Sequence, residues 1–377
     1  MLVYIGMIII SLVFAILANK TKSKIRKIIY YIGICIPFII VSGIRYDVGT
    51  DYMFRYVPNY ISISEGKNVT SLEPIFLLII KICLIFSNDY ALLFIVTSTI
   101  TITLIMISIF KNSKNIIMSV IIFFVGSFFF QSMNLVRQFM AMAVIILSYK
   151  LLFNKKTIIF WLCSSVVAVL IHSMSVVILI AIVFDKKVFD YRIVLACSTI
   201  FAFFGKNVIK FVLSLAENSN ITNIAKYAHY AEQGGNLIWS SLIVEFLIYV
   251  YFIVIYNNAK KNEIKLEKEG IFFINAQATA FFAIVMNVHI DLFFRVSIVF
   301  SAFQLISIPY FYNISKKCEF KILKNNRLLN NINLINKGIV VVILLLMTSR
   351  MIFSNIIKGS DEILPYKTIF LDERKEK

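Results

Sequence analysis

Long apolar runs separated by short basic or polar segments are the feature that most constrains the fold of this chain. A helix crosses a bilayer with about 20 apolar residues, and shorter helices are tolerated inside a bundle. Backbone groups in lipid must find hydrogen-bond partners within the chain, so such runs become helices. With 60% hydrophobic and 15% charged residues, the chain is too apolar for an ordinary soluble protein. We predict 12 spans, near residues 2–18, 28–44, 90–110, 116–132, 137–153, 157–171, 173–184, 191–205, 237–256, 270–287, 291–311 and 337–356.

The apolar run 75–86 is predicted to be a re-entrant or interfacial helix that stays on one side of the membrane. It is short, contains Lys81 and directly follows Glu73-Pro74. Leaving it out of the spans, with the N-terminus outside, puts the basic clusters on the inner side of the membrane. Those clusters explain the net charge of +18, so no nucleic-acid partner is predicted. The first run lacks a basic segment before it and a cleavage pattern, which favours a span over a removed signal peptide.

This topology predicts one transmembrane domain over residues 1–357 and an external C-terminal tail over 358–377. The longest external loops are 45–89 and 206–236, and the second is a candidate lid or substrate-contact loop. The same topology puts a sparse set of polar residues on the external side, where a single cavity could gather them. The set comprises Arg45, Asp47, Asp51, Arg137, His172, His289, Asp291 and Arg295.

The segment 43–52 sets Arg45, Asp47 and Asp51 directly after an apolar helix. Ionisable groups are costly at the rim of a bilayer, so their clustering indicates a substrate site. One carboxylate could act as general base towards a sugar hydroxyl, with Asp51 favoured over Asp47, or both could orient Arg45 and Arg55. The plainer alternative is that Arg45 snorkels to lipid headgroups and the carboxylates are solvated loop residues.

Arg137 and Gln138 are predicted to lie at the external entrance of a span. A guanidinium keeps its proton and binds phosphate oxygens in a bidentate manner, so Arg137 suits a lipid-linked pyrophosphate. The alternative is a structural arginine bonded to backbone carbonyls or a headgroup. His172, at a predicted external turn, could accept a hydroxyl proton or bond a phosphate, and a capping or packing role is the alternative.

A further polar set, Asn287, His289, Asp291 and Arg295, stands at the mouth of a late helix pair. Arg295 follows Asp291 by four residues, so an intrahelical ion pair is the plain alternative to a substrate role. The sequence has no Asp-x-Asp pair, no His-Glu-x-x-His, no Gly-Lys-Ser/Thr phosphate loop and no Gly-x-Ser-x-Gly. These absences disfavour a metal-dependent sugar-nucleotide enzyme and an ATP-driven pump. The five cysteines show neither a disulfide framework nor a metal-ligand spacing.

Three short motifs resemble the EpsG family of Wzy-like membrane polymerases for bacterial exopolysaccharide, capsule and O-antigen. They are Arg45-Tyr46-x-x-Gly49-Thr50-Asp51-Tyr52, then Arg137-Gln138-x-x-Ala141, then His172-Ser173, in the expected order over about residues 43–175. The resemblance implies a metal-independent glycosyltransferase that joins oligosaccharide repeat units carried on undecaprenyl pyrophosphate, at the outer face of the cytoplasmic membrane. The expected fold is an all-α, polytopic membrane bundle of GT-C-like type.

We therefore expect two or three arginines to hold the pyrophosphates of the donor and acceptor lipids, with Asp51 or His172 as the proton acceptor. No metal or other cofactor is expected, and a chain-length regulator and a flippase of the same pathway are candidate partners besides membrane lipid. The expected phosphate-binding residues are Arg45, Arg137 and Arg295, and the expected sugar or substrate contacts are Tyr52, Tyr56, Gln138, Tyr230 and His289.

Two rival functions remain in other classes. A flippase or transporter of the same lipid-linked oligosaccharide would place charges through the midplane and often show two similar halves, whereas here the candidates gather at one face. An acyltransferase acting on polysaccharide at the outer face would need a histidine with a nearby carboxylate and an inward route for the acyl donor. A purely structural scaffold would not need arginines at the membrane rim.

Overall fold

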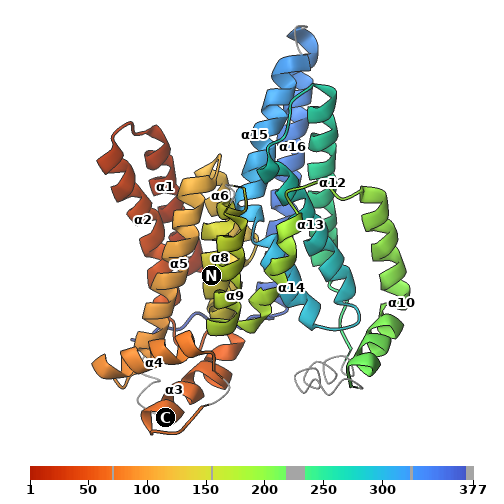
Figure 1. Ribbon diagram of the computed structural model, residues 1–377. Helices are drawn as coiled ribbons and strands as arrows, with labels where there is room; N and C mark the ends of the chain where they lie inside the picture. The colour runs from red at the N-terminus through yellow and green to blue at the C-terminus, as the bar shows by residue number, and fades with distance from the viewer. Residues whose placement is uncertain (70–71, 154–155, 218–233, 323–325, 371–377) are drawn as a thin grey trace. The chain divides into compact units, whose positions relative to one another are not determined.

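The computed structural model describes residues 1–69, 72–153, 156–217, 234–322 and 326–370. The regular secondary structure of these residues is helical, apart from one antiparallel bridge between Arg45 and Thr368. The α-helices are α1 Leu2–Lys20, α2 Lys24–Gly43, α3 Val57–Ser64, α4 Pro74–Phe86, α5 Ala91–Asn112, α6 Ile116–Val125, α7 Phe128–Asn134, α8 Val136–Ser148, α9 Thr157–Leu170, α10 Tyr191–Glu217, α12 Trp239–Lys261, α13 Lys268–Met286, α14 Leu292–Ser301, α15 Gln304–Ile322 and α16 Asn326–Met351 (Figure 1). Short π-helical segments are η1 Tyr52–Tyr56 and η4 Ile352–Ile357, and 3-10 segments are η2 Tyr149–Leu152 and η3 Ser173–Val183.

The all-helical membrane fold predicted from the sequence is confirmed, but the count of 12 spans and the GT-C-like arrangement are not. Six described helices are long and apolar enough to cross a membrane, or eight if two bent pairs each count as one span. The bent pairs are α6 with α7, at 53°, and α14 with α15, at 45°. Four other runs were predicted to be spans. Three of them, 137–153, 157–171 and 173–184, form the shorter segments α8 with η2, α9 and η3, and the fourth, 191–205, falls in α10.

The chain forms two compact units. Unit 1 comprises Met1–Val176 and Leu344–Lys377, and unit 2 comprises Val177–Ile343. The described part of the tail, 358–370, belongs to unit 1, and the single transmembrane domain 1–357 with an external tail 358–377 stays a prediction. Each unit has its own arrangement of helices and is described by itself below.

Unit 1 contains a run of helices in which α1 packs on α2, α2 on α5, and α5 on α8 (Figure 1). The α2–α5 approach depends on Gly43, because a Cβ there would lie 3.2 Å from Ile95 Cα. Next to this contact, the hydroxyls of Ser42 and Ser98 lie 2.7 Å apart and share a hydrogen bond. Small residues thus bring the end of α2 against the first half of α5.

The break between α6 and α7 sets the start of α8. Ser127 has a left-handed φ of +65°, which turns the chain after Gly126. Arg350 donates to the freed Gly126 carbonyl oxygen at 3.0 Å, which satisfies a carbonyl that the interrupted helix leaves without its usual partner. The short helix α7 then ends at Asn134, and α8 begins two residues later.

The tail crosses the segment that follows α2. Tyr46 N–H donates to Lys367 O and Ile369 N–H donates to Ile44 O, both at 3.0 Å. Tyr366 Oη donates to Val41 O at 2.9 Å. The tail therefore braces the polar motif after α2 instead of extending away from it.

Unit 2 is built on α12, α13, α14 and α15, with α10 against α13. Its core holds a polar cluster in which Glu245 Oε2 accepts from Gln277 Nε2 and Gln304 Nε2, each at 2.7 Å. Gln304 Nε2 also donates to Gln277 Oε1 at 3.0 Å. All three side chains are buried, so these bonds offset the desolvation of a carboxyl group between three helices.

Candidate active site

Three side chains from distant segments of unit 1 meet at one carboxylate. Glu73 directly precedes α4, Arg137 lies in the first turn of α8, and His172 joins α9 to η3. Arg137 Nη1 donates to Glu73 Oε2 at 2.5 Å, and His172 Nδ1 lies 3.1 Å from Glu73 Oε1. The side chains of Arg137, Glu73 and His172 are 12%, 16% and 10% exposed. This cluster is largely shielded from solvent, and each of its three side chains keeps a small exposed fraction.

The charge of Glu73 is fixed by its neighbours. Burial alone would raise the pKa of Glu73, but the hydrogen bond from His172 and the charge of Arg137 outweigh it and lower the pKa to about 2. Glu73 is therefore ionised at neutral pH and has no proton to give. Because the pKa falls on folding, the stabilisation from this carboxylate is complete above its ordinary pKa of 4.5 and is lost as the pH falls towards 2.

The ionised carboxylate selects one tautomer of His172. A carboxylate only accepts hydrogen bonds, so the Nδ1 atom that faces it carries the hydrogen and the neutral ring keeps its lone pair on Nε2. His172 Nε2 is buried, and no described residue hydrogen-bonds to it. Buried polar atoms nearly always have partners, so this exception points to a ligand group. His172 Nε2 is the candidate proton acceptor of the site.

Arg137 combines two features that favour an anion. It stands in the first turn of α8, where the helix dipole is positive and backbone N–H groups have no intrahelical partner. Glu73 offsets the cost of a cation there, and the Arg137 guanidinium also lies 5.8 Å above the Phe76 ring. The guanidinium has five N–H donors, of which the Glu73 contact engages Nη1. A phosphate oxygen approaching this turn meets both the guanidinium and the helix dipole.

The motif 45–52 folds onto Asn134, just before Arg137. Asn134 Oδ1 accepts hydrogen bonds from Thr50 Oγ1 at 2.7 Å and from Asp51 N–H at 2.9 Å. Asn134 Nδ2 donates to Asp361 Oδ1 in the tail at 3.1 Å. Gly49 turns the chain with φ +102°, a conformation that favours glycine. Two of the predicted motifs thus form one structure, in which 45–52 holds the residues that lead into α8.

The guanidinium of Arg45 is buried and fully engaged by protein. The residue is 1% exposed. Its Nη2 donates to Met133 O at 2.9 Å and its Nε to Val48 O at 3.3 Å. Nη1 donates to the carbonyl and hydroxyl oxygens of Ser42 and to Ser98 Oγ. Arg45 therefore ties the end of α2 to α5 and α7, and its predicted role as a phosphate ligand stays a prediction.

Arg45→Met is expected to destabilise the protein by about 3–5 kcal/mol, because the buried carbonyls that Arg45 bonds are left without donors. Arg45→Lys is not expected to restore stability, since one ammonium group cannot reproduce the planar fork. Thermal unfolding of the purified protein in detergent measures both. Arg55→Met is the control, because Arg55 is 46% exposed and 3.8 Å from Asp51. A stable but inactive Arg45→Met would instead favour phosphate binding by Arg45.

The comparison with protein families matches the EpsG family over residues 28–368. The chain belongs to the EpsG family. Membership indicates a Wzy-like polysaccharide polymerase in a multi-pass membrane protein. No curated protein and no solved structure matches the chain. Within the described residues, no group of three or more His, Cys, Asp or Glu could hold a metal ion, and metal independence stays a prediction.

In this EpsG family member, the other predicted residues of unit 1 differ in their burial and in their partners. Asp47 is exposed, with a left-handed φ of +52°, and Asp51 lies 3.8 Å from Arg55. Tyr52 stacks on Phe94, with ring centroids 3.9 Å apart. Tyr52, Tyr56 and Gln138 are all buried, so their predicted sugar contacts would need surface that protein atoms now cover.

Tyr56 supports the start of α8 directly. Its hydroxyl accepts from Val136 N–H and donates to Asn134 O, both at 3.1 Å. Burial raises the pKa of Tyr56, and the charge of Asp51 raises it further, while Arg137 acts in the opposite direction. Tyr56 therefore stays neutral and serves as a fixed link between η1 and α8.

The remaining predicted residues belong to unit 2 or fall outside the described residues. His289 and Arg295 belong to unit 2, where His289 Nε2 bonds Phe201 O at 2.8 Å. The role of Arg295, on α14, as a phosphate ligand stays a prediction. Tyr230 and most of the predicted lid, 218–233, fall outside the described residues.

Sequence analysis used Glu73 only as the boundary of a short helix. One signal pointed further: a carboxylate stands alone at the edge of an apolar helix in a predicted external loop, where charge is costly. Its partners, Arg137 and His172, are 64 and 99 positions away along the chain. Their pairing could not be read from local spacing.

Proposed function

We propose that this protein polymerises undecaprenyl-pyrophosphate-linked oligosaccharide repeat units into a capsule, exopolysaccharide or O-antigen chain, at the outer face of the bacterial cytoplasmic membrane. Family membership supports the reaction class. The observation that carries the residue roles is the Glu73–His172 hydrogen bond, which leaves His172 Nε2 buried without a described partner beside Arg137.

In this mechanism, Glu73 holds His172 in the tautomer that can accept a proton at Nε2. The acceptor sugar hydroxyl attacks the anomeric carbon of the donor, the bond between that carbon and the pyrophosphate oxygen breaks, and the hydroxyl proton passes to His172 Nε2. Arg137 and the first turn of α8 stabilise the negative charge that grows on the departing lipid pyrophosphate. Glu73 is a positioning residue, and Asp51 remains the alternative proton acceptor.

Surface glycan from a deletion strain tests the proposal. Wild-type protein supplied in trans should restore a ladder of chain lengths on a gel, whereas Glu73→Gln should leave single repeat units. Glutamine has one accepting oxygen in place of two, so its NH2 group would face either Arg137 or the Nδ1–H of His172, and the charge that holds His172 is lost. Glu65→Gln is the matched control, because Glu65 pairs with Lys67 in the same external segment but is 50% exposed. A full ladder with Glu73→Gln at wild-type protein levels would reject the assigned roles.

One observation favours a second function. The Glu73–His172 pair supplies the histidine and carboxylate that an acyltransferase would use. The same strain separates the two functions, because an acyltransferase mutant keeps the full ladder and loses only the acyl groups on the polymer.

A further inference from the structure

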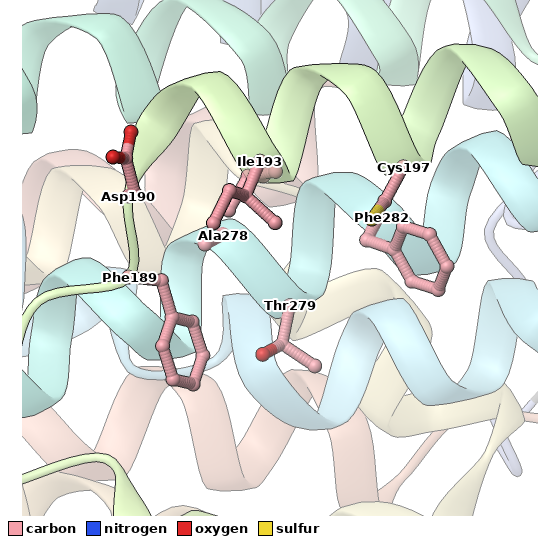
Figure 2. A pocket seen from close by; sticks show the side chains of 8 residues that line it. Phe189, Asp190, Ile193, Cys197, Ala278, Thr279 and Phe282 are labelled. Carbon is pink, nitrogen blue, oxygen red and sulfur yellow. The ribbon is translucent and has the colours of Figure 1, made fainter.

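An apolar groove runs between α10 and α13 in unit 2. Ile193 and Cys197 of α10 line it together with Ala278, Thr279 and Phe282 of α13, and Figure 2 shows Ile193 beside Ala278 and Cys197 beside Phe282. The groove has a volume of about 330 Å³ and is almost wholly apolar. Ile193 is 62% exposed, so the described residues leave this face of α10 uncovered. Such a surface suits a flexible hydrocarbon chain.

The groove continues into a second cavity with a basic rim. This cavity, of about 590 Å³, shares Phe189, Asp190 and Ile193 with the groove and extends to Tyr256 and Asn257 of α12. Its rim carries three cations, Lys186, Lys187 and Arg192, against one carboxylate, Asp190. The two lysines are exposed, so their ammonium groups are available to an anion.

A buried asparagine holds the basic segment in place. Asn275 of α13 is 0% exposed. Its Nδ2 donates to Phe184 O at 2.8 Å and to Lys187 O at 2.7 Å, and its Oδ1 accepts from Phe189 N–H at 2.8 Å. The loop that carries the lysines is therefore fixed to the same helix that forms one wall of the groove.

Nearby carboxylates do not cancel the positive rim. Asp185 is paired with Lys268 at 3.4 Å. Asp190 Oδ1 accepts the backbone N–H of Arg192 at 2.9 Å, so part of its hydrogen-bonding capacity caps the start of α10. Three cations against one carboxylate leave a net positive edge directly beside an apolar groove.

We infer that this combined surface binds one anionic phospholipid. The phosphate of the headgroup lies against Lys186, Lys187 and Arg192, and an acyl chain lies in the groove between α10 and α13. Charge complementarity selects this occupant, because a basic pocket beside membrane helices recognises a lipid phosphate while the groove accepts the chain. In the topology predicted from sequence, these cations lie at the inner face, so the lipid comes from the inner leaflet. This site is independent of the Glu73–His172 chemistry.

Native mass spectrometry of the purified full-length protein tests the inference, with phosphatidylglycerol and phosphatidylcholine as probes. Wild-type protein should retain one phosphatidylglycerol in preference to phosphatidylcholine. Lys186→Gln/Lys187→Gln should weaken phosphatidylglycerol binding roughly tenfold. Lys111→Gln/Lys114→Gln is the matched control, since it removes the same charge from two exposed lysines of unit 1 and should leave binding unchanged.

Alkylation of Cys197 gives a second readout that does not depend on a variant. Cys197 lines the groove and is partly exposed, so phosphatidylglycerol should slow its reaction with a maleimide at least severalfold more than phosphatidylcholine does. Cys163 on α9 is also partly exposed and serves as the internal reference.

Three results would overturn the inference. They are equal retention of the two lipids, an equal loss of phosphatidylglycerol in the Lys111/Lys114 control, and Cys197 protection that follows protein concentration instead of lipid. The last result would show that a second copy of the chain covers the groove.

Discussion

His172→Asn is expected to slow polymerisation by roughly 10²- to 10⁴-fold, the usual contribution of a general base. An asparagine side chain can still donate to Glu73 through its amide, as His172 Nδ1 does now, but it places no basic atom where Nε2 stands. The variant therefore removes the proton acceptor with little change in the charge or the packing around Glu73. We expect its thermal stability to stay close to that of the wild type.

The pH profile separates a catalytic from a structural role of His172. The pKa of Glu73 is lowered to about 2, so Glu73 stays ionised throughout a measurement between about pH 5 and 8. A fall in wild-type chain lengthening towards acidic pH then reports a base other than Glu73, and this acidic limb should vanish in His172→Asn. Purified protein with lipid-linked repeat units provides the assay. A folded His172→Asn with wild-type rate and profile would transfer the role of base to Asp51.

Sequence patterns predicted the helical membrane fold because hydropathy is a local property that each run displays by itself. They did not predict where those runs bend. The run 116–132 looks continuous in hydropathy, but Ser127 adopts a left-handed conformation and splits it into α6 and α7. A carbonyl freed by such a break needs a partner, and the partner is Arg350, more than two hundred positions later. Hydropathy alone therefore does not locate a break that a distant side chain stabilises.

Arg45 and Arg137 also look alike in local sequence but differ in their distant partners. Arg45 follows an apolar helix, Arg137 lies at the start of one, and sequence analysis assigned both to phosphate binding. Arg45 is buried because Ser98 and Met133, 53 and 88 positions away, offer it oxygen atoms that replace water. Arg137 instead meets Glu73 at the edge of the cluster and stays 12% exposed. Local sequence identifies an arginine at a membrane rim, but only its partners decide whether it faces a ligand or the core.

Arg137→Lys is expected to lower kcat/KM for the lipid-linked donor by roughly 10²- to 10³-fold, the cost of losing one preorganised donor to a developing anion. Lysine keeps the positive charge, and its ammonium can still pair with Glu73, so the cluster should remain folded. Lysine lacks the planar guanidinium of arginine. That guanidinium engages Glu73 through one nitrogen, and its other N–H groups suit phosphate oxygens. The change therefore tests geometry separately from charge.

Arg55→Lys is the matched control for Arg137→Lys, because Arg55 is a half-exposed cation in η1, just before α3, and is paired with Asp51 at 3.8 Å. It should change the rate less than about twofold. Competition by an isoprenyl pyrophosphate adds a direct reading of the anion site. Inhibition should weaken in Arg137→Lys and stay at the wild-type level in Arg55→Lys. The affinity for the inhibitor depends on the planar guanidinium of Arg137 only if that group touches the pyrophosphate. Equal inhibition of both variants would therefore place the pyrophosphate elsewhere and leave Arg137 as the structural partner of Glu73.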